Sequence, residues 1–127
     1  MIYKITTQKS LKTIKNELES HAKKSGFGVL GSYEFKKILE KKNFPIEKDI
    51  TVYELCNPSE AQIFLSAVPE ISVYLPCRIS VYEENDKTVL ATIDLHDILD
   101  SVEGHDELKE QMKSVFWHMI ELLKSWK

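Results

Sequence analysis

The C-terminal part of the chain carries the pattern that most constrains the fold. Apolar side chains recur there every three or four residues, at Leu108, Met112, Val115, Met119, Leu122 and Trp126. The neighbouring residues Phe116, Ile120 and Leu123 widen this stripe. The spacing predicts a long amphipathic helix over about residues 105–126. An apolar face this wide is typical of a helix that packs on a sheet, so the rest of the chain must supply one.

Alternating apolar and polar residues predict the strands of that sheet. The alternation covers residues 2–7, 50–56, 78–83 and 88–94, and a shorter apolar segment centres on Val29 and Leu30. Residues 71–75 alternate as well and are predicted to be extended. Helical spacing and capping residues predict helices over about 10–25, 35–43 and 58–68. These helices and strands form one domain, residues 1–127, because no interdomain linker separates them.

Charge and hydropathy exclude several classes of partner. The formal net charge is −3, which argues against a general nucleic-acid binder because such proteins carry a basic excess. No apolar run approaches the roughly 18 residues that cross a bilayer, so we expect no membrane association. The N-terminal segment MIYKITTQKS lacks the features of a signal peptide. We therefore expect a cytoplasmic protein.

The cysteines and histidines are not spaced like metal ligands. The two cysteines, Cys56 and Cys77, are 21 positions apart and form no CxxC motif. The four histidines form neither an HxxxH nor an HExxH pattern. We therefore expect no dedicated metal site and no disulfide framework.

The segment between the cysteines predicts a helix with a well-defined start. Asn57 is a strong N-cap, Pro58 suits the first helical position, and Glu60 stands where a capping-box carboxylate would. An 11-residue helix advances roughly 16 Å. An extended return of seven residues covers roughly 23 Å. We therefore predict that Cys56 and Cys77 lie near the same end of the sheet.

Two interpretations of the cysteines remain open. Free cysteine is among the most buried residue types, and Cys77 alternates with Ile79 and Val81 as core residues do. This favours core packing. Cys56, however, lies just before a helix N-terminus, an environment that can lower a thiol pKa. A reactive or ligand-facing role for Cys56 is the alternative.

The segments GFGVLGSYEFKKILEKKNFP and CNPSEAQIFLSAVPEISVYLPCRISVYEENDKTVLATID resemble the family known as domain of unknown function 302. The resemblance covers roughly residues 11–100 and leaves the C-terminal helix outside. The matching residues are Cys56, Asn57, Pro58, Glu70, Leu75, Pro76 and Cys77. The resemblance implies an α+β fold, with an antiparallel sheet backed by helices in a TATA-binding-protein-like arrangement. It also implies a homodimer. It implies no activity, and a fold by itself does not assign one.

Two functional hypotheses follow. The first is a small soluble, non-catalytic binding module for a small ligand or protein partner, with a site formed by Cys56, Asn57, Tyr74 and Cys77. The N-terminus of the helix after Asn57 would supply N–H donors for an anion. The second is a thiol-based sulfur-carrier or redox protein that uses Cys56. Haem binding through His118 and Met119 is a minor alternative. No catalytic residues are assigned, and the sequence identifies no cofactor.

Overall fold

The computed structural model of the protein describes residues 1–99 and 102–127. Within these residues the chain forms an antiparallel five-stranded sheet in the order β1-β5-β4-β3-β2. The strands are β1 (Ile2–Thr7), β2 (Gly28–Glu34), β3 (Thr51–Cys56), β4 (Cys77–Glu84) and β5 (Lys87–Ile93). Together with the helices, this sheet confirms the predicted α+β class.

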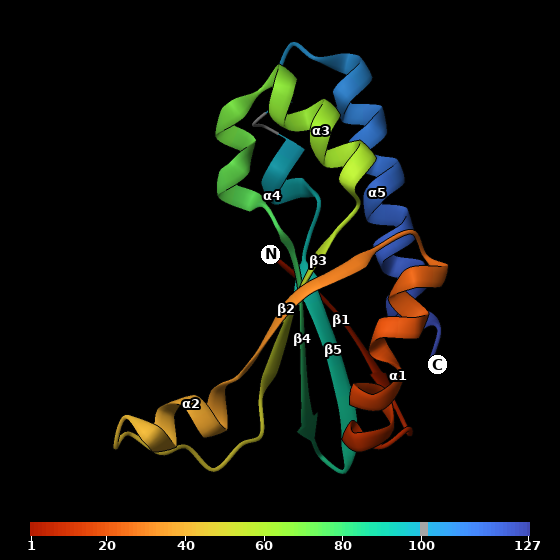
Figure 1. The fold of residues 1–127 in the computed structure, drawn as a ribbon. Helices are drawn as coiled ribbons and strands as arrows, with labels where there is room; N and C mark the ends of the chain where they lie inside the picture. The colour runs from red at the N-terminus through yellow and green to blue at the C-terminus, as the bar shows by residue number, and fades with distance from the viewer. Residues whose placement is uncertain (100–101) are drawn as a thin grey trace.

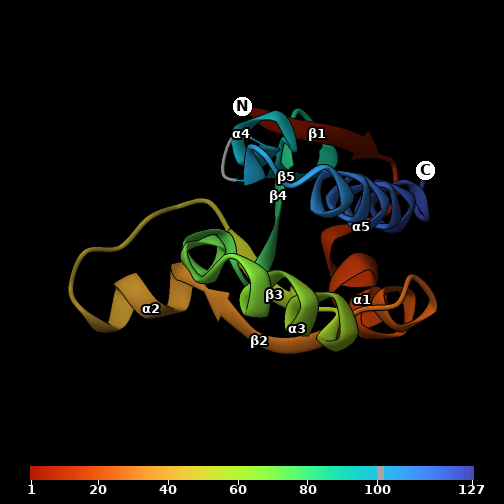
Figure 2. The same cartoon turned by 90° about the horizontal axis from the view of Figure 1, so that it is seen from above.

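The helices occupy three places relative to the sheet. They are α1 (Leu11–Lys24), α2 (Phe35–Lys41), α3 (Pro58–Ala67), the 3-10 helix η1 (Pro69–Tyr74), α4 (His96–Leu99) and α5 (Asp106–Lys124). The helices α3, η1 and α4 gather at one end of the sheet, beside the first turns of α5 (Figure 1). Further along, α5 runs down past the sheet towards α1, while α2 lies at the opposite end of the sheet (Figures 1 and 2).

Local chemistry explains several element ends. Ser10 caps α1, because its Oγ accepts the N–H of Thr13 at 3.1 Å. Gly26 follows α1 with a φ of +88°, a left-handed conformation that glycine adopts without steric cost. Asn85 and Asp86 both have positive φ, as a two-residue hairpin turn between β4 and β5 requires.

The prediction that residues 71–75 are extended is wrong, because most of this segment belongs to η1. The apparent strand alternation placed Ile71 and Val73 on one face. In the structure Ile71 is fully buried and Val73 is 76% exposed. The buried residues are instead Val68 and Ile71, a spacing of three that matches one 3-10 turn. Pro69 starts this turn directly after α3.

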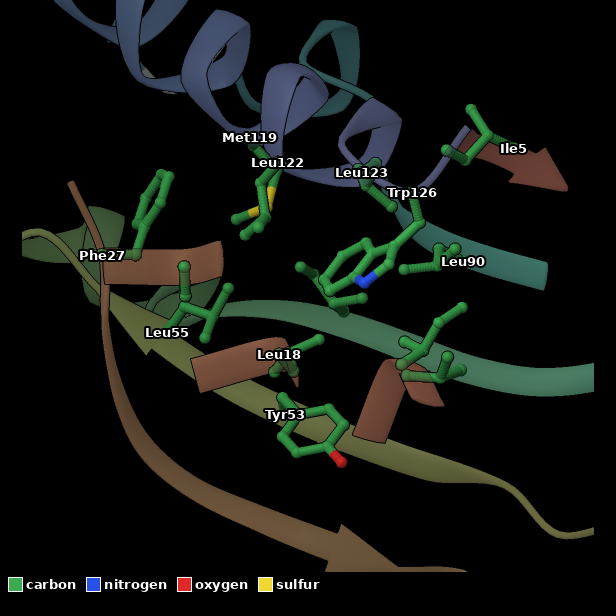
Figure 3. Close-up of a cluster of buried hydrophobic side chains, with 14 of the residues drawn as sticks. Ile5, Leu18, Phe27, Tyr53, Leu55, Leu90, Met119, Leu122, Leu123 and Trp126 are labelled. Atoms are coloured by element: carbon green, nitrogen blue, oxygen red, sulfur yellow. The ribbon is translucent and has the colours of Figure 1, made fainter. Parts of the chain in front are cut away.

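The main hydrophobic core lies between the sheet, α1 and the second half of α5. We call it the sheet core. Figure 3 shows its side chains converging from these elements. From α1 it takes Leu11, Ile14, Leu18 and Ala22; from the sheet and its flanks Ile5, Phe27, Tyr53, Leu55, Ile79, Val81 and Leu90; and from the C-terminal segment Met119, Leu122, Leu123 and Trp126.

A second, smaller cluster lies beyond the end of the sheet, and we call it the cap. Its buried members are Phe64, Val68, Ile71, Val102, Leu108 and Met112. Val115 of α5 packs against both clusters. The predicted C-terminal helix is thus confirmed, but its apolar stripe is divided. The first half of the stripe packs in the cap and the second half packs on the sheet.

Candidate functional site

A cavity lies where the cap meets the sheet. Its volume is about 270 Å³. Residues from β2, β3, α3, the segment after α3 and α5 surround it, and most of them are apolar. The lining consists of Phe27, Leu30, Leu55, Cys56, Asn57, Glu60, Ala61, Phe64, Leu65, Ser72, Leu75, Pro76, Cys77 and Val115. We refer to it as the α3 cavity.

Three of the four predicted site residues line this cavity: Cys56, Asn57 and Cys77. The fourth, Tyr74, does not. Tyr74 lines a smaller neighbouring cavity of about 70 Å³, towards α4 and α5. The two cavities share part of their lining, formed by Phe64, Leu75, Cys77 and Val115. The structure therefore places all four residues around two adjoining hollows.

The path of the chain explains why the ends of the segment 56–77 meet. The ten residues of α3 carry the chain about 15 Å away from Cys56. The six residues of η1, which packs beside α3, return about 12 Å. Cys77 then starts β4 opposite Leu55. The cysteines lie at the same end of the sheet, as predicted, although the return is helical and not extended.

The thiol of Cys77 is held in its protonated form. Burial raises the pKa of Cys77 to about 11, and the proximity of Cys56 adds to this rise. Both cysteines are free thiols. Cys77 is paired with Leu55 and shares its face of the sheet, whereas successive residues of a strand such as Leu55 and Cys56 point to opposite faces.

The N-terminus of α3 offers few donors for an anion. Pro58 has no N–H group. The N–H of Glu60 donates to Oδ1 of Asn57 at 3.3 Å, and the N–H of Ala61 donates to the backbone oxygen of Asn57 at 2.9 Å. At most the N–H of Ser59 remains in the first turn. The predicted anion site is therefore not supported, because the Asn57 cap already occupies the position that an anion would take.

Glu60 is the charged residue of the cavity lining. Its Oε2 atom is buried and has no hydrogen-bond partner among the described residues. In a capping box this carboxylate would return to the N-cap N–H, and Oε2 makes no such bond. Sequence analysis identified Glu60 only as a capping residue. The available signal was an acidic residue in the first turn of a helix, close to Ala61, Phe64 and Leu65, which also line the cavity.

Exposed leucines border the α3 cavity. Leu30 is 64% exposed and Leu65 is 38% exposed, and both belong to the lining. The pairing of β2 with β3 shifts register between Val29 and Gly31, so Leu30 is the extra residue of a β-bulge. Bulges redirect a side chain from the regular alternation of a strand. Leu30 thus gives the cavity an apolar rim that strand periodicity does not predict.

The other sequence candidates do not converge on a site. His118 is exposed, whereas Met119 is buried in the sheet core and lines the smaller cavity, so the two do not face one haem pocket.

Nδ1 of His96 lies 2.8 Å from Oδ1 of Asp94, and this oxygen also accepts the His96 N–H at 3.0 Å. These contacts lower the pKa of Asp94. Among the described residues, no group of three His, Cys, Asp or Glu side chains is arranged to hold a metal ion.

Comparison with known proteins places the chain in a family. The family described as domain of unknown function DUF302 matches residues 3–125. The chain belongs to this family. The DUF302 match includes α5, which sequence analysis placed outside the family-like core. No curated protein matches the chain.

A solved structure shows the same fold. It is the crystal structure of an uncharacterized conserved DUF302 protein from Bacillus stearothermophilus, with a TM-score of 0.88 and 24% sequence identity. The match covers 99% of this chain and 98% of the other. At this identity the likeness concerns the fold alone. The TATA-binding-protein-like arrangement stays a prediction. In the described part of the DUF302 chain, no helix combines the length and apolarity needed to span a membrane.

Proposed function

We propose that this DUF302 protein is a non-catalytic binding module for a small apolar molecule, which it holds in the α3 cavity. The observation that carries the proposal is the hollow itself. Its volume of about 270 Å³ is surrounded mainly by aliphatic and aromatic side chains with a few polar groups, Asn57 and Glu60 among them. Apolar walls with a few placed polar groups are the usual composition of small-molecule sites.

The rim and the neighbouring hollow support the same proposal. Leu30 and Leu65 expose apolar surface beside the cavity, so an apolar ligand would meet such surface before it enters. Phe64 and Val115 line both the α3 cavity and the smaller cavity. A change of rotamer at these side chains would lengthen the site without a change of the backbone.

Filling the cavity tests the proposal. Ala61 of α3 lines the cavity, and Ala67 of the same helix is exposed and lies outside the lining. We expect Ala61→Phe to abolish the fluorescence increase of a neutral naphthylamine fluorophore titrated into the protein. Ala67→Phe is the matched control and should bind as the unmodified protein does. Equal binding by both variants, or none by the unmodified protein, would contradict the proposal.

A thiol-based function of Cys56 is the second candidate. Cys56 lines the cavity and directly precedes Asn57, the N-cap of α3. However, the lining includes no lysine, arginine or histidine to stabilise a thiolate. Cys56→Ser should retain fluorophore binding under the binding-module proposal. If Cys56 in the folded protein resists a small alkylating agent, the thiol candidate is rejected.

The homodimer implied by the family resemblance stays a prediction. Ile2 and Ile93 are paired across β1 and β5 and are 66% and 42% exposed, so this edge of the sheet offers apolar surface. Light scattering during size-exclusion chromatography measures the mass directly. A monomeric mass at micromolar concentration would reject the homodimer and leave the binding proposal unchanged.

A further inference from the structure

The charge of the α3 cavity constrains the ligand more than its apolar walls do. Glu60 belongs to the lining, and the lining includes no lysine, arginine or histidine. An anionic head group would therefore meet a like charge without a compensating cation. A buried charge is strongly disfavoured unless it is paired.

The carboxylate of Glu60 also has unused hydrogen-bonding capacity. Its Oε2 atom is buried and lacks a partner among the described residues. A buried polar atom of this kind calls for an explanation, and an absent ligand donor is one. The carboxylate can turn about its last torsion, which is soft for glutamate, so an oxygen can face the cavity without backbone movement.

The other polar groups at this end of the cavity reinforce the preference for a donor. Oδ1 of Asn57 already accepts the Glu60 N–H and the Ser59 hydroxyl, at 3.3 Å and 2.9 Å. Burial keeps the thiol of Cys77 protonated, since its pKa is raised to about 11. Neither residue supplies a cation to Glu60, so a ligand head that carries a donor would find this carboxylate without a competing cation from the lining.

From this arrangement we infer that the α3 cavity binds a molecule with a hydrocarbon body and a cationic, hydrogen-bond-donating head, of the alkylammonium class, whose head pairs with Glu60. The inference rests on the proposed function and specifies its ligand class. The apolar body lies among Phe64, Leu75 and Val115. The head lies at the Glu60 end.

Three probes with one chain and different heads test the inference: octylammonium, 1-octanol and octanoate, titrated calorimetrically at neutral pH. Octylammonium should bind at least about tenfold more tightly than octanoate, the effect of one charge-assisted hydrogen bond. Glu60→Gln keeps the size of the side chain and removes its charge, so it should abolish this difference. Glu121→Gln, on the exposed face of α5, removes a charge of the same sign and should retain it.

The outcomes separate the two proposals. Equal binding of the three probes, or tighter binding of octanoate, overturns the cationic-head inference while the cavity proposal stands. A preference for octylammonium that Glu121→Gln reduces as much as Glu60→Gln also overturns it, because the net charge would then be the cause. If no probe binds to the unmodified protein and the fluorophore does not bind either, both proposals fail. Melting curves of the variants show whether each one is folded.

Discussion

The sheet core and the cap differ in their position relative to the two cavities. In the sheet core Ile14, Leu18, Leu90 and Leu122 are fully buried and line neither cavity. The cap borders both cavities, which Phe64 helps to line. Filled interiors have the density of organic crystals, whereas apolar hollows stay empty or bind apolar molecules. We therefore expect the sheet core to contribute most of the free energy of unfolding and the cap to hold a ligand.

The largest expected effect comes from the C-terminal tryptophan of the sheet core. Trp126 is 3% exposed; its ring stacks on His21 with the ring centroids 4.1 Å apart, and its Nε1 donates to Glu17 at 3.0 Å. Trp126→Ala should lower the free energy of unfolding by about 3–5 kcal/mol, because it leaves a large hole and removes a hydrogen bond. Urea denaturation followed by circular dichroism measures this change.

The control for Trp126 is the other tryptophan. Trp117 lies on α5 and is 59% exposed. Trp117→Ala should therefore change the free energy of unfolding by less than about 0.5 kcal/mol. Equal losses of unfolding free energy for the two variants would show that the C-terminal segment does not close the sheet core. The contrast between the sheet core and the cap would then be wrong.

An intermediate effect is expected when a larger side chain replaces an alanine in each region. Ala22 of α1 is fully buried in the sheet core, whereas Ala61 of α3 faces the cavity. Ala22→Leu should lower the free energy of unfolding by about 1–3 kcal/mol through overpacking. Ala61→Leu should cause no loss, and a gain of up to about 1 kcal/mol is expected if the side chain fills the hollow. Urea denaturation compares the two, and a comparable loss in both would mean that the cap is packed as tightly as the core.

The same contrast explains how much of the fold the sequence predicts. In the sheet core one face of β3 and of β4 is buried, so alternation in residues such as Cys77, Ile79 and Val81 locates β4 correctly. In the cap no sheet imposes a period of two. There Ile71 and Val73 alternate in sequence like strand residues, yet η1 buries one and exposes the other. Only packing against α5 and Val102 decides which pattern applies.

The candidate site is predictable to a similar extent. Asn57 and the two cysteines could be placed together, because a helix and its return fix where the chain comes back. Glu60 and Leu30 could not be assigned to the cavity. The role of Glu60 depends on which hydrogen bonds its carboxylate fails to make, and Leu30 owes its position to a β-bulge. Neither property is encoded in a local pattern of apolar residues.

The smallest expected effect concerns Cys77, at the border between the filled core and the hollow. Burial raises the pKa of its thiol to about 11 in the folded protein, from an ordinary value near 9. Below pH 9 the folded and unfolded states both hold the proton, so the contribution of Cys77 to stability is fully present. As the pH rises from 9 towards 11, the unfolded state releases the proton and the folded state retains it, so this contribution is lost.

The difference in unfolding free energy between the unmodified protein and Cys77→Ala should therefore shrink over that range. Val115 lines the same two cavities and has no titrating group. The difference in unfolding free energy between the unmodified protein and Val115→Ala should therefore stay constant over this range. Urea denaturation at pH 8, 9, 10 and 11 measures both, and a constant difference for Cys77→Ala would mean that water reaches the thiol and that the hollow is not apolar at the border.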